Sequence, residues 1–138
     1  MQSKSYITTD REKLDVNFIH DNLCNRLYWA KGRSRELVEK SIANSLCFGV
    51  FSKPNTHIGF ARIVTDFVVF AWLMDVFVDD GYRNQGTGRY LLETIRAHPQ
   101  LKEVSGIGLR TNETHGLYAK FGFVPIPEPN TWMFKKRR

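Results

Sequence analysis

The spacing of apolar residues divides the first third of the chain into three predicted elements. Residues 4–9, KSYITT, are predicted to form a strand. A helix is predicted over residues 10–29, with Asp10 as its N-cap. The apolar residues near one face of this helix are Leu14, Phe18 and Cys24. Ser34 is placed to cap a second helix over residues 35–45. Its helically spaced apolar residues are Leu37, Val38 and Ile42.

The pattern then changes to that of strands. Residues 46–52, LCFGVFS, and residues 56–66, THIGFARIVTD, are separated by the turn residues Pro54 and Asn55, so the pair is predicted to form a hairpin. Residues 70–78, FAWLMDVFV, are almost continuously apolar. Such a run is typical of a strand that is buried on both faces.

A glycine-rich turn, YRNQGTGRYLL over residues 82–92, leads into the next predicted helix. Leu91, Leu92 and Ile95 face inward on this helix, which is expected to stop near His98 because Pro99 follows. A strand, a short helix and a last strand are predicted over residues 104–111, 113–121 and 130–136. This order indicates an α/β or α+β domain around one sheet.

Composition limits the domain count and the location. The 138 residues are 42% hydrophobic, enough for one well-packed core, so we predict a single domain over residues 1–138. No apolar run approaches the ~20 residues of a membrane span, and the N-terminus lacks the apolar centre of a secretory signal. We therefore expect a soluble, cytoplasmic protein. Cys24 and Cys47 have no metal-type spacing, which favours buried thiols and no metal site.

The net charge of +6 favours polyanionic partners, either nucleic acid or a phosphorylated cofactor. The clearest basic run, Lys135 to Arg138, is interpreted as a solvated tail. Lys and Arg are otherwise scattered without a basic and aromatic stripe, which argues against nucleic acid.

Three phosphate-binding patterns are candidates for the turn after residue 78. A dinucleotide fingerprint would need a third glycine at position 91, which is Leu91. A P-loop would need lysine at position 87, which is Thr87. The remaining pattern is R-x-x-G-x-G, from Arg83 to Gly88, between a buried strand and an amphipathic helix. Its backbone N–H groups and the helix N-terminus suit a pyrophosphate, although an ordinary strand-to-helix turn is an equally good interpretation of these few residues.

Together with this turn, the segment LYAKFGF over residues 117–123 resembles the GNAT superfamily of acyl-CoA-dependent N-acyltransferases. The two motifs lie about 30 residues apart with a predicted strand between them, and the resemblance extends over nearly the whole chain. It implies a mixed, mostly antiparallel sheet flanked by helices. Two departures are Asp80, where many members have proline, and the short segment TNETHG before Tyr118.

The resemblance implies acetyl-CoA as co-substrate and a set of binding residues. Backbone groups of the strand end at Val76, Phe77 and Val78 would hold the pantetheine arm and the thioester oxygen. The turn that follows would hold the pyrophosphate through the N–H groups of residues 84–89. The cofactor-binding candidates there are Arg83, Asn84, Gln85, Gly86, Thr87, Gly88 and Arg89.

Two residues are candidates for the chemistry. Tyr118 matches the family's general acid, which protonates the departing sulfur; the alternative is that it only packs its ring. Asp75 is the one charge inside FAWLMDVFV, and a buried carboxylate is costly unless it is partnered or used. Asp75 is therefore either the base that takes the proton of the amine or a structural ion-pair partner, for instance of an arginine.

The acceptor is expected to be an amine that the sequence does not identify. Tyr28 and Trp29 lie at the loop that often shapes the acceptor pocket in the family, with core packing as the alternative. His115 lies three residues before Tyr118 and is a further substrate-binding candidate, with helix capping or simple exposure as the alternative. A homodimer is a possible assembly. The competing function is a non-catalytic acyl-CoA-binding or basic nucleic-acid-binding module.

Overall fold

The computed structural model describes residues 5–26, 30–111 and 115–137. In this part of the chain five strands form one mixed sheet in the order β1-β2-β3-β4-β5. The first four pair antiparallel, and β5 runs parallel to β4. The strands are β1 (Ser5–Thr8), β2 (Leu46–Ser52), β3 (Thr56–Thr65), β4 (Phe70–Val78) and β5 (Gly106–Gly108). The predicted hairpin is β2 and β3.

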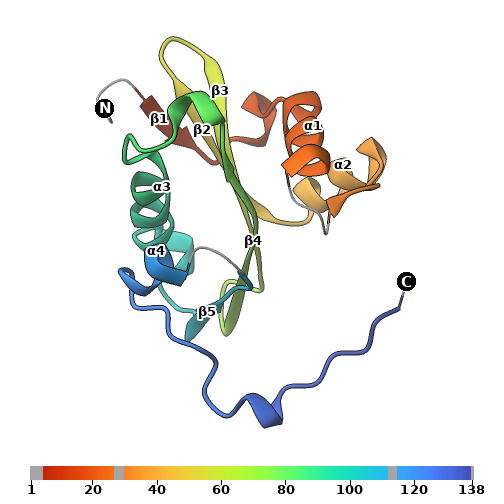
Figure 1. Ribbon diagram of the computed structural model, residues 1–138, viewed down its shortest axis with the longest axis vertical. Coiled ribbons are helices and arrows are strands. Elements are labelled where there is room, and N and C mark those ends of the chain that lie inside the picture. Colours follow the sequence, from red (N-terminus) through yellow and green to blue (C-terminus); the bar gives the residue numbers. More distant parts are fainter. Residues whose placement is uncertain (1–4, 27–29, 112–114, 138) are drawn as a thin grey trace.

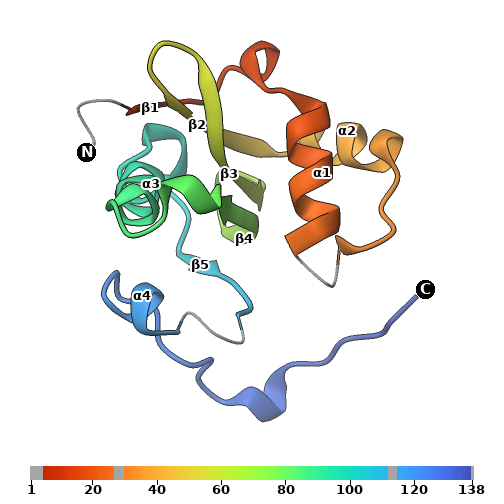
Figure 2. The same ribbon diagram turned by 45° about the horizontal axis from the view of Figure 1, so that its top comes forward.

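Helices cover both faces of the sheet (Figures 1 and 2). On one face lie α1 (Val16–Arg26) and α2 (Arg35–Ala43), and on the other lie α3 (Thr87–Arg96) and α4 (His115–Ala119). Short 3-10 turns occur at Arg11–Lys13, Asp80–Tyr82, Pro99–Leu101 and Pro129–Thr131. No helix of the described residues is long and apolar enough to cross a membrane.

Each face of the sheet has its own hydrophobic core. Under α3 the inward residues are Leu91, Leu92 and Ile95, as predicted, and Tyr118 of α4 joins the same cluster. Under α1 and α2 the core contains Ile19, Leu23, Val38, Ile42, Phe60 and Phe77. Burying each side chain of this size contributes roughly 1.5–3 kcal/mol, so the two cores fix both helical layers on the sheet.

The single helix predicted over residues 10–29 is wrong. Asp10 does cap a helix, but this is the 3-10 turn Arg11–Lys13, where its carboxylate accepts from Glu12 N at 3.0 Å. Asp15 then accepts from Phe18 N at 3.2 Å, and α1 starts afresh at Val16. The second cap changes the helical register, so Ile19 and Leu23 of α1 are fully buried. The cap predicted at Ser34 is confirmed, because its Oγ accepts from Leu37 N at 3.1 Å.

Two strand predictions also need correction. The strand predicted over residues 104–111 is only the three-residue β5, and the strand predicted over residues 130–136 is absent. From residue 124 onward the chain instead runs away from α4 as an extended segment without strand partners among the described residues (Figures 1 and 2).

Burial on both faces along all of β4 is not observed, since buried and partly exposed residues alternate along the strand. The strand nevertheless contributes to both cores. Ala71 and Leu73 belong to the core under α3, whereas Phe77 belongs to the core under α1 and α2. The buried side chains of β4 therefore switch from one face of the sheet to the other between residues 73 and 77.

Candidate active site around β4 and the start of α3

A β-bulge in β4 causes this change of face. Phe60 of β3 pairs with Phe77, but Arg62 pairs with Met74, so β4 has one residue more than β3 in this interval. Asp75 occupies the bulge with φ +57°, in the left-handed region that Asp adopts more readily than most residues. Such a bulge bends the strand and turns a side chain to a new direction.

The carboxylate of Asp75 is held by two arginines from distant segments. Its Oδ2 accepts from Arg33 Nη1 at 3.0 Å and from Arg62 Nε at 2.9 Å. Arg62 comes from β3, and Arg33 lies between α1 and α2. The Asp75 side chain is fully buried, and its Oδ1 has no hydrogen-bond partner among the described residues. The contacts of Asp75 are therefore those of an ion pair with arginine, and its second carboxylate oxygen can still accept a hydrogen bond.

Arg62 connects this ion pair to the rest of the bulge. Its Nη1 donates to Ser45 Oγ at 3.1 Å, and its Nη2 lies 3.5 Å from Met74 Sδ. The guanidinium thus contacts Met74, Asp75 and the end of the segment after α2. Loss of one partner would leave a buried charge without compensation, a change that typically costs about 3–5 kcal/mol.

Beyond the bulge, one edge of β4 has no strand partner in the described chain. Pairing with β5 runs from Phe70 with Gly106 to Trp72 with Gly108 and stops there. Val76 and Phe77 pack against the two cores, one on each face of the sheet. The backbone edge from residue 73 to Val78 can therefore accept an extended substrate as an added strand.

The turn after β4 presents a row of backbone donors. Asn84 and Gly86 adopt φ +61° and +80°, and Gly86 is the N-cap of α3. Tyr90 N is the first amide of α3 that donates to the backbone, to Gly86 O at 2.9 Å. Among the described residues, the N–H groups of residues 84–89 donate to no acceptor. These donors and the helix dipole together make this 84–89 turn suited to an anion.

The side chains of the 84–89 turn stabilise it from within. Thr87 is buried and its Oγ1 donates to Tyr82 O at 3.4 Å, and Gln85 Nε2 donates to Gly81 O at 3.4 Å. The preceding Arg83 forms an exposed ion pair with Asp80 at 3.1 Å. The site is therefore made mainly of backbone groups.

Gly88 brings the helix that carries Tyr118 next to this turn. A Cβ at Gly88 would lie 3.8 Å from Leu117 Cδ2, so α4 lies directly against the first turn of α3. Tyr118 itself is 9% exposed and its ring packs edge-on against Phe123, with centroids 5.7 Å apart. The candidate general acid is thus fixed in the core next to the 84–89 turn.

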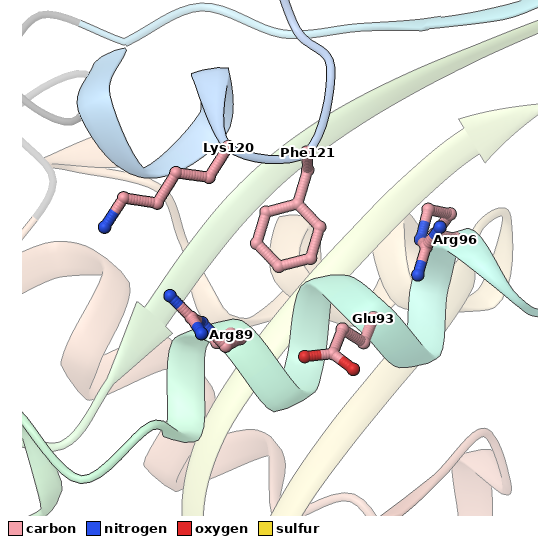
Figure 3. Close-up of a pocket in the computed structure, with 5 residues that line it drawn as sticks. All are labelled: Arg89, Glu93, Arg96, Lys120 and Phe121. Atoms are coloured by element: carbon pink, nitrogen blue, oxygen red, sulfur yellow. The ribbon is translucent and has the colours of Figure 1, made fainter.

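A basic depression of about 350 Å³ lies along the outer face of α3 and α4. Figure 3 shows Arg89, Glu93 and Arg96 along α3, with Lys120 and Phe121 extending over them from the end of α4. Three cations and one carboxylate give this surface a net positive charge next to the 84–89 turn. Sequence reasoning selected only Arg89 from this group.

The acceptor candidates remain predictions. Tyr28 and Trp29 lie outside the described residues, and for His115 only the backbone, at the start of α4, is described. Sequence reasoning also missed Arg33 and Arg62 as the partners of Asp75. The available signal was Arg62, a charge within the apolar run of β3 that faces the apolar run of β4 across a hairpin. Among the described residues, no group of three or more His, Cys, Asp or Glu could hold a metal ion.

Comparisons with known proteins assign this chain and its fold to a family. A family model described as "Acetyltransferase (GNAT) domain" matches residues 43–125. A crystal structure of a GNAT-family protein from Xanthomonas campestris pv. campestris is similar with a TM-score of 0.92 and 37% identity, over 96% of this chain and 93% of that one. The chain therefore belongs to the GNAT family of acetyltransferases, as its two motifs suggested.

Curated relatives agree with this assignment. "Histone acetyltransferase TAP1" of Glycine max is 33% identical over 81% of this chain, which spans 53% of that protein. A Gibberella zeae protein named as an acetyltransferase is 25% identical over 79% of this chain and 73% of its own length. Family members use acetyl-CoA as co-substrate, and this chain is accordingly an N-acetyltransferase with the predicted mixed, mostly antiparallel sheet.

Proposed function

We propose that this enzyme transfers the acetyl group of acetyl-CoA to a primary amine by direct attack. The observation that carries the proposal is the row of N–H groups without an acceptor in the 84–89 turn. This turn directly follows the unpaired edge of β4. The turn would bind the pyrophosphate, with Arg89 adding positive charge. The pantetheine arm would extend along Val76, Phe77 and Val78 as an added strand.

In this arrangement a backbone group stabilises the oxyanion and Tyr118 acts as the general acid. The amine nitrogen attacks the thioester carbon and forms the C–N bond, a backbone N–H of the β4 edge stabilises the resulting oxyanion, and collapse of this intermediate breaks the C–S bond. The Tyr118 hydroxyl donates its proton to the departing sulfur. Tyr118 shares the core under α3 with residues of β4, which supports a place near the end of the pantetheine arm.

Asp75 is proposed to receive the proton of the amine, directly or through one water. Its Oδ1 is the acceptor that the two arginines leave without a partner. Orienting the amine by a hydrogen bond is the other contribution that this oxygen can make.

The acceptor itself is proposed only as an amine. Tyr28, Trp29 and His115 are the residues proposed to contact it, and the substrate in the name of the soybean relative belongs to that protein. Cytoplasmic localisation remains a prediction.

The test is release of CoA thiol from acetyl-CoA across a panel of small amines, amino acids and basic peptides, with product masses determined. We expect one class of amine to gain 42 Da, the mass of an acetyl group replacing hydrogen, at a rate well above the blank. Tight acetyl-CoA binding without turnover of any amine would favour the binding-module alternative. Salt-dependent DNA binding without acetyl-CoA binding would overturn the proposal.

A further inference from the structure

Arg33 and Arg62 hold the same carboxylate, but they differ in the donors that they still have free. Arg62 is buried, and each of its three side-chain nitrogens has a partner, in Asp75, Ser45 and Met74. Arg33 donates from Nη1 to Asp75 Oδ2 at 3.0 Å. In the part of the chain that the structure describes, its Nε and Nη2 have no acceptor. The edge of the Arg33 guanidinium that Nε and Nη2 form is therefore open.

The surroundings of Arg33 fix the position of this open edge. Arg33 N donates to Ala30 O at 3.1 Å, and the Arg33 carbonyl oxygen accepts from His20 Nε2 of α1 at 2.8 Å. The next residue, Ser34, caps α2. Since Asp75 ties the side chain to β4, three elements hold Arg33 in place. A guanidinium that is already held loses little conformational freedom when it binds a ligand.

The ion-pair cluster of Arg33, Arg62 and Asp75 has a surplus of positive charge. Two guanidinium groups and one carboxylate give it a net charge of +1. The side chain of Arg33 is 17% exposed, whereas that of Asp75 is fully buried, so the surplus charge is accessible at Arg33. The two parallel donors on an arginine edge match the two oxygens of a carboxylate. The open edge is therefore suited to an anionic group.

This edge lies beside the place where the acetyl group is proposed to arrive. Asp75 is part of the β4 edge from residue 73 to Val78, which has no strand partner in the described chain and is proposed to hold the pantetheine arm. Asp75 Oδ1, buried and without a hydrogen-bond partner among the described residues, is proposed to accept from the amine. Arg33 binds the other oxygen of the same carboxylate. An acceptor for an amine and a pair of donors for an anion are thus adjacent.

We propose that the acceptor is a free amino acid, with its amine toward Asp75 Oδ1 and its carboxylate on the Nε and Nη2 edge of Arg33. This inference rests on the proposed function and names its substrate class. In an α-amino acid one carbon separates the amine from the carboxylate, which suits two groups joined by one ion pair. An amine without an anionic group would leave the charge of +1 unbalanced. A phosphate carries about −2 charges, more than this cluster balances.

The first experiment measures acetyl transfer to amino acids, to the corresponding amides and to the corresponding decarboxylated amines. Wild type is expected to favour the acids over their amides by about 10- to 100-fold in kcat/KM, the effect of hydrogen bonds to a charged group. Arg33→Lys keeps a positive charge beside Asp75 but removes the paired donors, so this preference should largely disappear. Arg35→Lys is the matched control, because it changes an arginine of α2 in an exposed ion pair with Glu39. Its preference should equal that of wild type.

The second experiment measures binding separately from catalysis. Calorimetry is carried out with CoA in place of acetyl-CoA, so that no acetyl group can be transferred. Wild type and Arg35→Lys are expected to bind an amino acid more tightly than its amide, and Arg33→Lys is expected to bind the two alike. Circular dichroism and thermal melting check that each variant is folded. The comparison of acid with amide on wild type does not depend on the variants.

The outcomes separate this inference from the proposed function. Equal kcat/KM for acids and amides, or a preferred acceptor that lacks a carboxylate or carries a phosphate, would overturn the amino-acid assignment and leave acetyl transfer to an amine intact. A folded Arg33→Lys variant that kept the full preference for acids would also overturn it. Tighter binding of acids than of amides, with no transfer to any amine, would instead support the amino-acid site and contradict the proposed function.

Discussion

At the scale of single residues, the unusual feature is Asp75, a carboxylate inside an apolar strand. Desolvating such a group is costly, and here two guanidinium groups at 2.9 and 3.0 Å compensate for it. The same contacts hold the residue at φ +57°, a conformation with an intrinsic cost of order 1 kcal/mol for a residue with a Cβ. The ion pairs with the two arginines therefore stabilise both the buried charge and the left-handed backbone conformation of Asp75.

Replacing Tyr118 with Phe separates its catalytic role from its packing. The ring packs edge-on against Phe123 and is buried, so Tyr118→Phe should keep the melting temperature nearly unchanged. Loss of a general acid typically reduces the rate about 10²- to 10⁴-fold, or about 3–5 kcal/mol of barrier. We expect kcat to fall in this range with little change in acetyl-CoA affinity, measured by steady-state kinetics and calorimetry.

Tyr6→Phe is the matched control for that experiment. This substitution also removes a tyrosine hydroxyl, which lies on β1 and donates to Asn55 Oδ1 at 3.1 Å in an exposed position. We expect kcat of this variant to be unchanged. If Tyr118→Phe also kept the wild-type rate across neutral pH, Tyr118 would be a packing residue. His115 would then be the next acid to test.

At the scale of elements, the start of α3 depends on two glycines for different reasons. Gly86 adopts φ +80°, which a side chain rarely tolerates, so its role is conformational. Gly88 lies within α3, and a Cβ there would make an ordinary contact with Leu117 Cδ2 at 3.8 Å, so only a side chain larger than that of alanine would be crowded. The sequence-based argument treated the two glycines alike, and the structure distinguishes them.

Substitutions at these two positions should therefore differ in a thermal-shift assay with acetyl-CoA. Wild type is expected to melt at higher temperature with the ligand, since acetyl-CoA binds the folded state. Gly86→Ala should cost about 1 kcal/mol of stability and weaken the shift. Gly88→Ala should fold normally, whereas Gly88→Leu should crowd Leu117 and the N–H groups and abolish the shift.

Gly106→Ala serves as the control for these variants, because no atom lies within 4 Å of the new Cβ and the position is on β5. Its ligand shift should equal that of wild type. A folded Gly88→Leu variant that bound acetyl-CoA as tightly as wild type would exclude the 84–89 turn as the binding site.

At the scale of the whole molecule, the buried His57 should make stability depend on pH. Its ring lies between Phe18 and Phe51, with centroids 4.5 and 4.4 Å away. Nε2 donates to Gly59 O at 3.0 Å, and Nδ1 is buried without a partner among the described residues. Burial lowers the pKa of His57 from 6.5 to about 4, because a second proton would place an unpaired charge in the core.

The sign of the effect follows from this lowered pKa. Between about pH 6.5 and 4 the unfolded chain binds a proton at His57 that the folded chain does not. The contribution of neutral His57 to the free energy of unfolding is therefore fully present above pH 6.5 and is lost as pH falls toward 4. At pH 5 the loss should be about 2 kcal/mol, or several degrees of melting temperature. Melting wild type and His57→Phe at pH 7 and 5 should show a smaller decrease in the variant; equal decreases would contradict the prediction.

Local sequence determined the features that depend on neighbouring residues. The cap at Ser34, the β2–β3 hairpin, the inward face of α3 and the glycine turn before it each follow from residue types within a few positions. The two motifs at residues 83–88 and 117–123 sufficed for the family. Capping, periodicity and turn geometry are short-range effects, so the amino-acid sequence alone is enough to predict them.

The tertiary structure decided which distant groups meet. Arg33 and Arg62 reach Asp75 across 42 and 13 positions, and their convergence depends on a bulge that changes the strand register. The strand-like pattern of residues 130–136 likewise forms no strand, because this segment runs away from the sheet and pairs with none of its edges. Strand pairing requires a partner at the right register, and packing of the whole chain, rather than any local pattern, determines which partners are available.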